Sequence, residues 1–367
     1  MKPEFCLNPA LARLPVYQPG RPIEEVAREL GLPAARIIKL ASNENPLGPS
    51  PKAQAAIAKA ARQMHLYPDG NAFYLKCRLA RALGVEPANL ALGSGSNEII
   101  EFLGHALLGP DTEVIVSEYC FAVYPIVTHL FGAKLVIVPA KNFGHDLTAM
   151  LAAVTPRTRI LFVANPNNPT GTLASAAALR RLVNAVPPHV MLVMDEAYVE
   201  FLPKPFDLLP FVRSGRKPNL ILLRTFSKIY GLAGLRIGYG IGHPEFIAAL
   251  EKVRQPFNLN AMAQAGALAA LDDTAHVRRT RQNNLAGMKL LETSLRKLGL
   301  EYVPSAANFI LVHVGEGQRV FEELQRRGVI TRPMGGYQLP EWIRISVGTP
   351  AENQRCLKAL GEVGITN

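Results

Sequence analysis

The sequence predicts an α/β protein with a mostly parallel, doubly wound sheet in a large domain, followed by a smaller α+β domain. Three observations support this prediction: short apolar runs rich in β-branched residues, segments of helical length between most of them, and a change of pattern after about residue 256. Strands that are buried on both faces and alternate with helices form parallel sheets. Ligands bind beyond the carboxyl ends of such strands, so the polar residues that follow the runs are candidate site residues.

A chain of 367 residues is too long for one ordinary core. We expect an N-terminal arm (residues 1–48) that joins the small domain and contacts a dimer partner, a large domain (49–256) and a small domain (257–367). In the arm, the spacing of Ile23, Val26, Ala27 and Leu30 predicts a helix that ends at Gly31. The segment KLASNENPLGPSP (39–51) predicts an extended strand and then turns, before an alanine-rich helix over residues 51–64.

The large domain contains six apolar runs of strand length. The helix between the first two is predicted to begin in the glycine-rich stretch GSGSNE (93–98) and to continue through Leu108. Residues 238–242 read as strand and turn, because a dinucleotide fingerprint needs a third glycine that is missing here. The six predicted strands cover residues 90–92, 114–116, 134–138, 160–163, 190–194 and 220–223.

The small domain is predicted to begin with one long helical region over residues 261–298. Strands over 310–314, 329–331 and 342–347 and helices over 319–327 and 352–363 follow. No internal repeat or low-complexity linker interrupts the chain.

The composition favours a well-buried globular enzyme, because 49% of the residues are hydrophobic and only 19% are charged. The net charge of +11 could indicate a nucleic-acid partner, but the basic residues are spread along the chain and no stripe alternates with aromatic residues. We therefore expect no nucleic-acid partner, and attribute the charge to solubility and to the attraction of anionic substrates.

The four cysteines lie far apart, no HExxH stretch is present, and no apolar run has the length of a signal peptide or a membrane span. These features predict a cytoplasmic protein with reduced thiols, no metal site and no membrane association.

The strongest candidate site lies in LILLRTFSKIYGLAGLRIG (220–238), where Lys228 follows a buried strand. Its amine can form a Schiff base with an aldehyde, while Thr225, Ser227 and Arg236 hold a phosphate on the same molecule. Taken alone, this pattern is equally compatible with a solvated lysine on a loop.

Two further strands end in polar residues. NPNNPTG follows residues 160–163 and DEAY follows residues 190–194. Each alone could be a turn or a helix start. Together with the free N–H groups of the GSGS turn, they supply what pyridoxal 5′-phosphate requires: an anion for the ring nitrogen, donors for the ring oxygen, a phosphate cup and an amine.

The order GSGSNE, NPNNPTG, DEAY, TFSK and GLAGLR resembles the fold-type I pyridoxal-phosphate aminotransferases along nearly the whole chain. Within them, LASNENPLGPSP and RPMGGYQLPEWIRISVGTPAEN resemble the histidinol-phosphate aminotransferases. The resemblance implies a seven-stranded sheet in the large domain and a homodimer with shared active sites.

The resemblance also implies roles for individual residues. Lys228 holds the cofactor covalently and moves the proton, Asp195 pairs with the ring nitrogen, and Asn168 and Tyr198 contact the ring oxygen. Phe121 stacks on the ring, with Tyr119 as the alternative. The remaining cofactor-binding positions are Gly95, Ser96, Asn97, Thr225, Ser227 and Arg236 for the phosphate, and Tyr67 for the cofactor of the partner subunit.

For the substrate, the resemblance assigns a carboxylate to Arg344, with help from Asn308, and a phosphate to Tyr17 and Arg332; Asn43 is a further predicted substrate contact. One pocket must take histidinol phosphate in one half-reaction and glutamate in the other, and both carry an anion at the far end. The implied reaction converts L-histidinol phosphate and 2-oxoglutarate into imidazole acetol phosphate and L-glutamate, in histidine biosynthesis.

Three different functions also fit the sequence. An aromatic-amino-acid aminotransferase could use Phe121, Gly336 and Tyr337 to line its pocket. A lyase similar to threonine-phosphate decarboxylase shares Lys228, Asp195 and the phosphate cup. A non-catalytic regulator that binds the cofactor belongs to a different class, and such proteins carry a DNA-binding module for which no extra segment is available.

Overall fold

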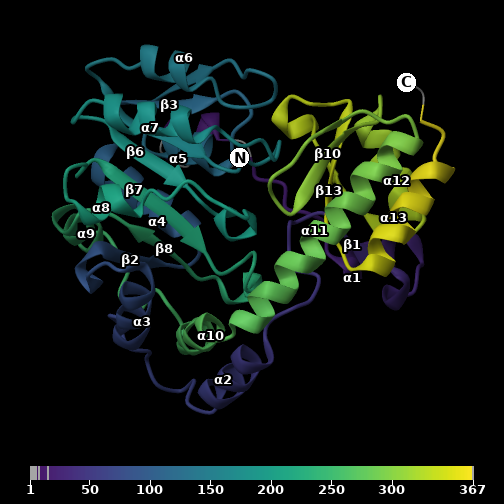
Figure 1. Cartoon of the computed structure of the whole chain (residues 1–367), viewed down its shortest axis with the longest axis horizontal. Helices are drawn as coiled ribbons and strands as arrows, with labels where there is room; N and C mark the ends of the chain where they lie inside the picture. Colours follow the sequence, from purple (N-terminus) through teal and green to yellow (C-terminus); the bar gives the residue numbers. More distant parts are fainter. Residues whose placement is uncertain (1–5, 7–8, 15, 366–367) are drawn as a thin grey trace.

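The computed structural model describes residues 6, 9–14 and 16–365, which form two lobes joined by the long helix α11 and by the N-terminal arm (Figure 1). The larger lobe surrounds a seven-stranded sheet. The smaller lobe contains a four-stranded sheet covered by helices. The division of the chain at residues 48 and 256 stays a prediction.

The large sheet has the order β2 (Leu90–Gly93), β8 (Gly238–Ile241), β7 (Leu220–Thr225), β6 (Met191–Asp195), β5 (Thr158–Ala164), β3 (Glu113–Ser117) and β4 (Lys134–Val138). All pairs from β7 to β4 are parallel, whereas β8 is antiparallel to both of its neighbours. The prediction of a mostly parallel, seven-stranded sheet is confirmed. The exception is β8, because the chain from Thr225 to Gly238 turns back without a crossover helix. Phe226 N–H donates to Ile237 O, which joins the two ends of this turn.

Successive residues of the strands contribute to two separate cores. Leu161 and Val163 of β5 belong to one hydrophobic cluster, whereas Ile160 and Phe162 belong to the other. The alternation follows from the period of two along a strand. The sheet is therefore buried on both faces. The first cluster is covered by α3 (Phe73–Leu83), α6 (Leu147–Ala152), α7 (Ala176–Ala185) and α8 (Leu209–Arg213), and the second by α4 (Ser96–Leu107), α5 (Val123–Leu130) and α9 (Pro244–Glu251).

The arm begins with the 3-10 helix η1 (Pro9–Arg13), which contacts α5 of the large lobe. Helix α1 (Ile23–Leu30) has the predicted bounds, and Gly31 ends it with a left-handed φ of 65°. After η2 (Ala34–Arg36), strand β1 (Ile38–Lys39) pairs in parallel with β11 (Val329–Ile330) of the small lobe. Helix α2 (Pro51–Ala61) then returns the chain to the large lobe and ends before the predicted Met64.

The small lobe contains an antiparallel sheet in the order β12 (Arg332–Pro333), β13 (Trp342–Ser346), β10 (Phe309–His313) and β9 (Tyr302–Val303). Helices α12 (Gly317–Arg326) and α13 (Pro350–Glu362) complete its core together with α11 (Thr274–Lys297). The remaining short 3-10 helices are η3 (Pro87–Asn89), η4 (Val199–Phe201), η5 (Ala233–Leu235) and η6 (Gly335–Tyr337).

Two predictions about the small domain are wrong in detail. The helical region over residues 261–298 is divided into α10 (Ala261–Leu271) and α11, because Asp273 caps α11 by accepting a hydrogen bond from His276 N–H. Helix α10 packs on α2 and within the core of the large lobe. The predicted strand over residues 329–331 is shorter, since β11 ends at Ile330 and pairs with the arm, and a separate strand, β12, follows and pairs with β13.

None of the helices in the described part of the chain is long and apolar enough to span a membrane.

Candidate functional site

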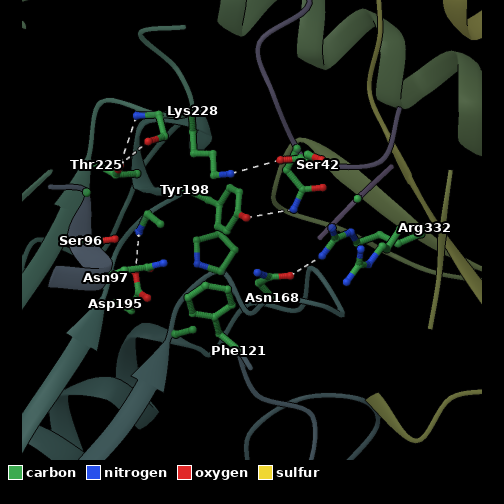
Figure 2. A pocket seen from close by; sticks show the side chains of 18 of the residues that line it. Ser42, Ser96, Asn97, Phe121, Asn168, Asp195, Tyr198, Thr225, Lys228 and Arg332 are labelled. Carbon is green, nitrogen blue, oxygen red and sulfur yellow. Dashed lines mark hydrogen bonds between the residues drawn. The ribbon is translucent and has the colours of Figure 1, made fainter. Parts of the chain in front are cut away.

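A pocket lies between the lobes, where β5, β6 and β7 end and α4 begins (Figure 2). Polar residues from the large lobe line one side of it. The arm and the small lobe contribute residues to the other side. The pocket therefore occupies the sheet edge at which the strand pattern predicts a ligand.

Most of the predicted site residues line this one pocket. They are Tyr17, Asn43, Gly95, Ser96, Asn97, Phe121, Asn168, Asp195, Tyr198, Thr225, Ser227, Lys228, Arg236, Arg332 and Arg344. Two do not line it: Tyr67 and Asn308.

Lys228 extends from the loop after β7 into the pocket, where its Nζ donates to the carbonyl oxygen of Ser42 at 3.3 Å (Figure 2). Burial disfavours the charged ammonium and lowers the pKa of Lys228 to about 8, and the positive charge of Arg344 adds to this effect. A substantial fraction of the amine is therefore neutral near physiological pH, which a nucleophilic lysine requires.

Asp195 is the last residue of β6 and is buried. Its Oδ2 accepts a hydrogen bond from the hydroxyl of Tyr124 at 2.7 Å, and its Oδ1 accepts one from Ala197 N–H at 3.1 Å. Burial raises the pKa of Asp195, and the Tyr124 hydrogen bond opposes that rise. Sequence reasoning missed Tyr124, because a single tyrosine in an apolar helix carries no signal of a polar partner.

The start of α4 and the loop after β7 form a cup for an anion. Ser227 N–H donates to Thr225 Oγ1 at 3.1 Å, and the Thr225 hydroxyl donates to Ser227 Oγ at 3.0 Å. Gly95 precedes α4 with a φ of 76°, and a Cβ at this position would lie 2.6 Å from Nη2 of Arg236. The guanidinium thus lies close to the free N–H groups at the helix start, and both attract a phosphate.

Asn168 and Tyr198 come from different loops and face the same cavity (Figure 2). Nη1 of Arg344 donates to Asn168 Oδ1 at 2.5 Å, and Nδ2 of Asn43 donates to the Tyr198 hydroxyl at 3.0 Å. Each predicted contact of the ring oxygen is therefore oriented by a residue outside the large lobe.

Arg344 and Arg332 lie directly opposite each other on β13 and β12. Arg344 is buried, and its Nη2 donates to Ala41 O at 3.0 Å, while its Nε has no hydrogen-bond partner among the described residues. Burial lowers the pKa of Arg344. Arg332 is half-buried, donates to Gln18 O at 2.5 Å and lies 5.9 Å from the ring centre of Tyr17. Two guanidinium groups side by side favour an anionic ligand.

The structure distinguishes the two aromatic candidates. Phe121 lines the pocket, whereas the Tyr119 ring is stacked against Phe143 at 5.9 Å between centroids. Tyr337 also lines the pocket, from η6.

The two remaining predicted residues have other positions. Tyr67 is 82% exposed and stacks on Phe257, with the ring centroids 4.6 Å apart. Asn308 holds the arm, because its Nδ2 donates to the backbone oxygen of Asn43 at 3.0 Å. Its effect on the pocket is thus indirect.

Among the residues that the structure describes, no group of histidine, cysteine and acidic side chains could hold a metal ion. The pocket offers instead an amine with a lowered pKa, a buried carboxylate, an anion cup and two arginines.

Comparison with known proteins agrees with this chemistry. Residues 35–360 match the family model described as "Aminotransferase class I and II". The chain is 54% identical to a histidinol-phosphate aminotransferase of Akkermansia muciniphila, with 99% of this chain and 100% of that protein covered. It is 53% identical to histidinol-phosphate aminotransferase 2 of Ralstonia nicotianae, with 94% and 93% covered. The crystal structure of a histidinol-phosphate aminotransferase from Sinorhizobium meliloti in complex with pyridoxal-5′-phosphate superimposes with a TM-score of 0.90 at 32% identity, covering 98% of each chain.

Proposed function

The chain belongs to the class I and II aminotransferase family, and on that basis we propose that it uses pyridoxal 5′-phosphate to transfer the amino group of L-histidinol phosphate to 2-oxoglutarate. The products are imidazole acetol phosphate and L-glutamate, and the reaction is a step of histidine biosynthesis. One observation carries the proposal: the amine of Lys228 and the buried carboxylate of Asp195 face one pocket that also contains an anion cup.

The residues of the pocket fit this cofactor. Gly95, Ser96, Asn97, Thr225, Ser227 and Arg236 would hold its phosphate. Asp195 would face the ring nitrogen, Phe121 the ring face, and Asn168 and Tyr198 the ring oxygen. A side chain at Gly95 would fill the space beside Arg236, so the close approach of backbone and guanidinium depends on the glycine. When bound, pyridoxal phosphate supplies an aldehyde that accepts the amino group and a ring that withdraws electrons from it.

Lys228 acts as the base in this proposal. Its Nζ would take the proton from the α-carbon of the substrate and would deliver it to the cofactor carbon that receives the amino group. Its lowered pKa of about 8 suits both directions, because the amine gains and loses a proton near the working pH. Asp195, a buried carboxyl group, would pair with the ring nitrogen of the cofactor and favour the protonated form of that nitrogen.

The two arginines would bind the anionic groups of both substrates. Arg344 would hold the carboxylate of glutamate or 2-oxoglutarate, and Arg332 with Tyr17 would hold the phosphate of histidinol phosphate. A buried cationic site left without an anion is unfavourable, so a donor with an uncharged side chain is disfavoured.

We further infer a homodimer with shared active sites. Five large hydrophobic side chains between residues 64 and 74 each expose more than half of their surface: Met64, Leu66, Tyr67, Phe73 and Tyr74. A contiguous exposed apolar segment is typical of an interaction surface. Tyr67 lies outside the pocket of its own chain and is available to the cofactor site of a second copy.

A cytoplasmic location is part of the same proposal, supported by the four free cysteines.

The decisive experiment is a half-reaction. The visible spectrum of the purified protein with bound cofactor is recorded before and after separate additions of histidinol phosphate, phenylalanine and glutamate. We expect histidinol phosphate to convert the cofactor to its amine form at a far lower concentration than phenylalanine. A preference for phenylalanine or tyrosine would contradict the substrate and indicate an aromatic-amino-acid aminotransferase.

Two further outcomes would identify a lyase or a regulator. Release of carbon dioxide from threonine phosphate would indicate the lyase. A protein without Schiff-base absorbance, or one that binds a DNA duplex specifically, would indicate the regulator. Lys228→Ala is the control for the mechanism, since this variant should bind the cofactor without a covalent link and lose the transfer. Appreciable turnover by the variant would rule out Lys228 as the base.

A further inference from the structure

We propose that Ser346 and Asn43 fix the direction of the Tyr198 hydroxyl proton, so that Tyr198 is a hydrogen-bond donor into the pocket. The inference rests on the proposed function, because the acceptor it serves is the ring oxygen of the cofactor. Asn43 and Ser346 are then positioning residues that act through Tyr198.

The three residues come from three parts of the chain. Asn43 belongs to the arm, Ser346 is the last residue of β13 in the small lobe, and Tyr198 follows β6 in the large lobe. All three are buried, with exposed fractions of 2%, 3% and 4%. Water therefore does not compete for their hydrogen bonds. The bond to the Tyr198 hydroxyl is drawn as a dashed line in Figure 2.

The polarity of this chain of hydrogen bonds is set by the orientation of the Asn43 amide, whose oxygen faces Ser346 and whose nitrogen faces Tyr198. The backbone N–H of Asn43 donates to Ser346 Oγ at 2.8 Å, and a backbone N–H can only donate. The Ser346 hydroxyl in turn donates to Asn43 Oδ1 at 3.0 Å. With the amide oxygen committed to Ser346, the amide nitrogen faces Tyr198 and donates to its hydroxyl oxygen at 3.0 Å.

The consequence concerns the proton of Tyr198. An amide nitrogen accepts no hydrogen bond, so the Tyr198 proton cannot point at Asn43 and must find another acceptor. Tyr198 lines the pocket, where the ring oxygen of the cofactor would be the acceptor. Burial raises the pKa of Tyr198 to about 12, so the hydroxyl keeps its proton at neutral pH.

The backbone supports the same arrangement. Asn43 has a φ of 54°, in the left-handed region that asparagine tolerates better than most residues. Nδ2 of Asn308 holds the backbone oxygen of Asn43 at 3.0 Å. The amide of Asn43 bonds to Ser346 and Tyr198, which gives Asn43 a positioning role. Asn43 also lines the pocket, and its contact with the substrate stays a prediction.

The test is the pH titration of the visible absorbance of the holoenzyme. A hydrogen bond donated to the ring oxygen stabilises its negative charge and favours the deprotonated chromophore. Ser346→Ala should therefore raise the midpoint of this pH titration by about half to one pH unit, the range expected for one neutral hydrogen bond. Ser346→Ala added to Tyr198→Phe should cause no further shift, and Ser117→Ala, a buried serine outside the pocket, should cause none.

An unchanged midpoint in Ser346→Ala overturns the inference, and so does a shift of the same size in the Tyr198→Phe background. If Ser346→Ala does not fold, Asn43→Gly gives the same test, since glycine adopts the left-handed backbone without the amide. Absence of a cofactor band in the unmodified protein overturns the proposed function, and this inference with it.

Discussion

The hydroxyl of Tyr124 donates to Asp195 at 2.7 Å, and the Tyr124 ring lies parallel to Phe162 at 4.3 Å between centroids, with 3° between the planes. The stack restricts the ring, and the hydroxyl bonds to Oδ2 of the carboxylate. Tyr124, on α5, thereby holds the proposed partner of the ring nitrogen.

Tyr124→Phe should keep the stack and lose the hydrogen bond. We expect the dissociation constant of pyridoxal phosphate to rise roughly tenfold, as for the loss of one hydrogen bond to a charged group. Because this bond opposes the rise in the pKa of Asp195, the variant should lose more affinity for the cofactor at pH 6 than at pH 8. Absorbance titration with the cofactor at both pH values measures the dissociation constant. Tyr302→Phe, in β9 and outside the pocket, is the control, and an equal affinity of Tyr124→Phe and the unmodified protein would contradict the prediction.

The pKa of Lys228 predicts how the protein without cofactor captures it. Burial lowers this pKa from 10.5 to about 8, so the neutral, reactive fraction of the amine increases as the pH rises through 8. At pH 7 roughly one tenth of the amine is neutral, against about one part in three thousand for an unshifted lysine. Stopped-flow absorbance after addition of the cofactor should show a capture rate with a midpoint near pH 8. A midpoint close to 10.5 would mean that the amine is solvated.

Arg332→Gln should weaken the binding of a phosphorylated donor more than that of an unphosphorylated donor. The substitution removes a charge beside Tyr17 and leaves Arg344 in place. We expect KM for histidinol phosphate to rise at least about tenfold, in line with one charge-assisted hydrogen bond, while KM for glutamate changes less. Steady-state kinetics with each donor measures the difference. Arg278→Gln, an exposed arginine of α11, controls for net charge, and equal effects on both donors would place the phosphate elsewhere.

Gly231 and Gly215 form a matched pair for stability. Both have left-handed backbones, with φ of 69° and 66°. A Cβ on Gly231 would lie 2.2 Å from the backbone oxygen of Gly48, whereas a Cβ on Gly215 meets nothing within 4 Å. Gly215→Ala should cost about 1 kcal/mol for the backbone alone, and Gly231→Ala about 2 kcal/mol more for the forced contact. Denaturant unfolding compares them, and equal losses would show that the arm can move away from the Lys228 loop without cost.

The large sheet and the pocket were predictable because their signals are local. A run of apolar, β-branched residues such as 220–223 predicts its own strand, and a parallel sheet brings the strand ends to one edge. Gly95, Asp195 and Lys228 therefore line one pocket although they are far apart in the sequence.

Other features depend on contacts between segments that no local pattern reveals. Tyr124 acquires its role only when α5 lies beside β6. The change of sheet between β11 and β12 occurs because the arm provides a partner for the first of them. The break between α10 and α11 did have a local signal, the Asp272–Asp273 pair, since aspartate is a frequent helix cap.

The pairing of β1 with β11 also sets an order of assembly during protein synthesis. Ile38 is opposite Val329, so the arm leaves the ribosome long before its partner strand exists. All strands of the large sheet lie between the two, and that sheet can form while the arm is still unpaired. Leu40 then bonds to both Ile330 and Ser346, which completes the small lobe and the far side of the pocket in one late step. The polypeptide therefore becomes able to bind substrate only after nearly all of it has been translated.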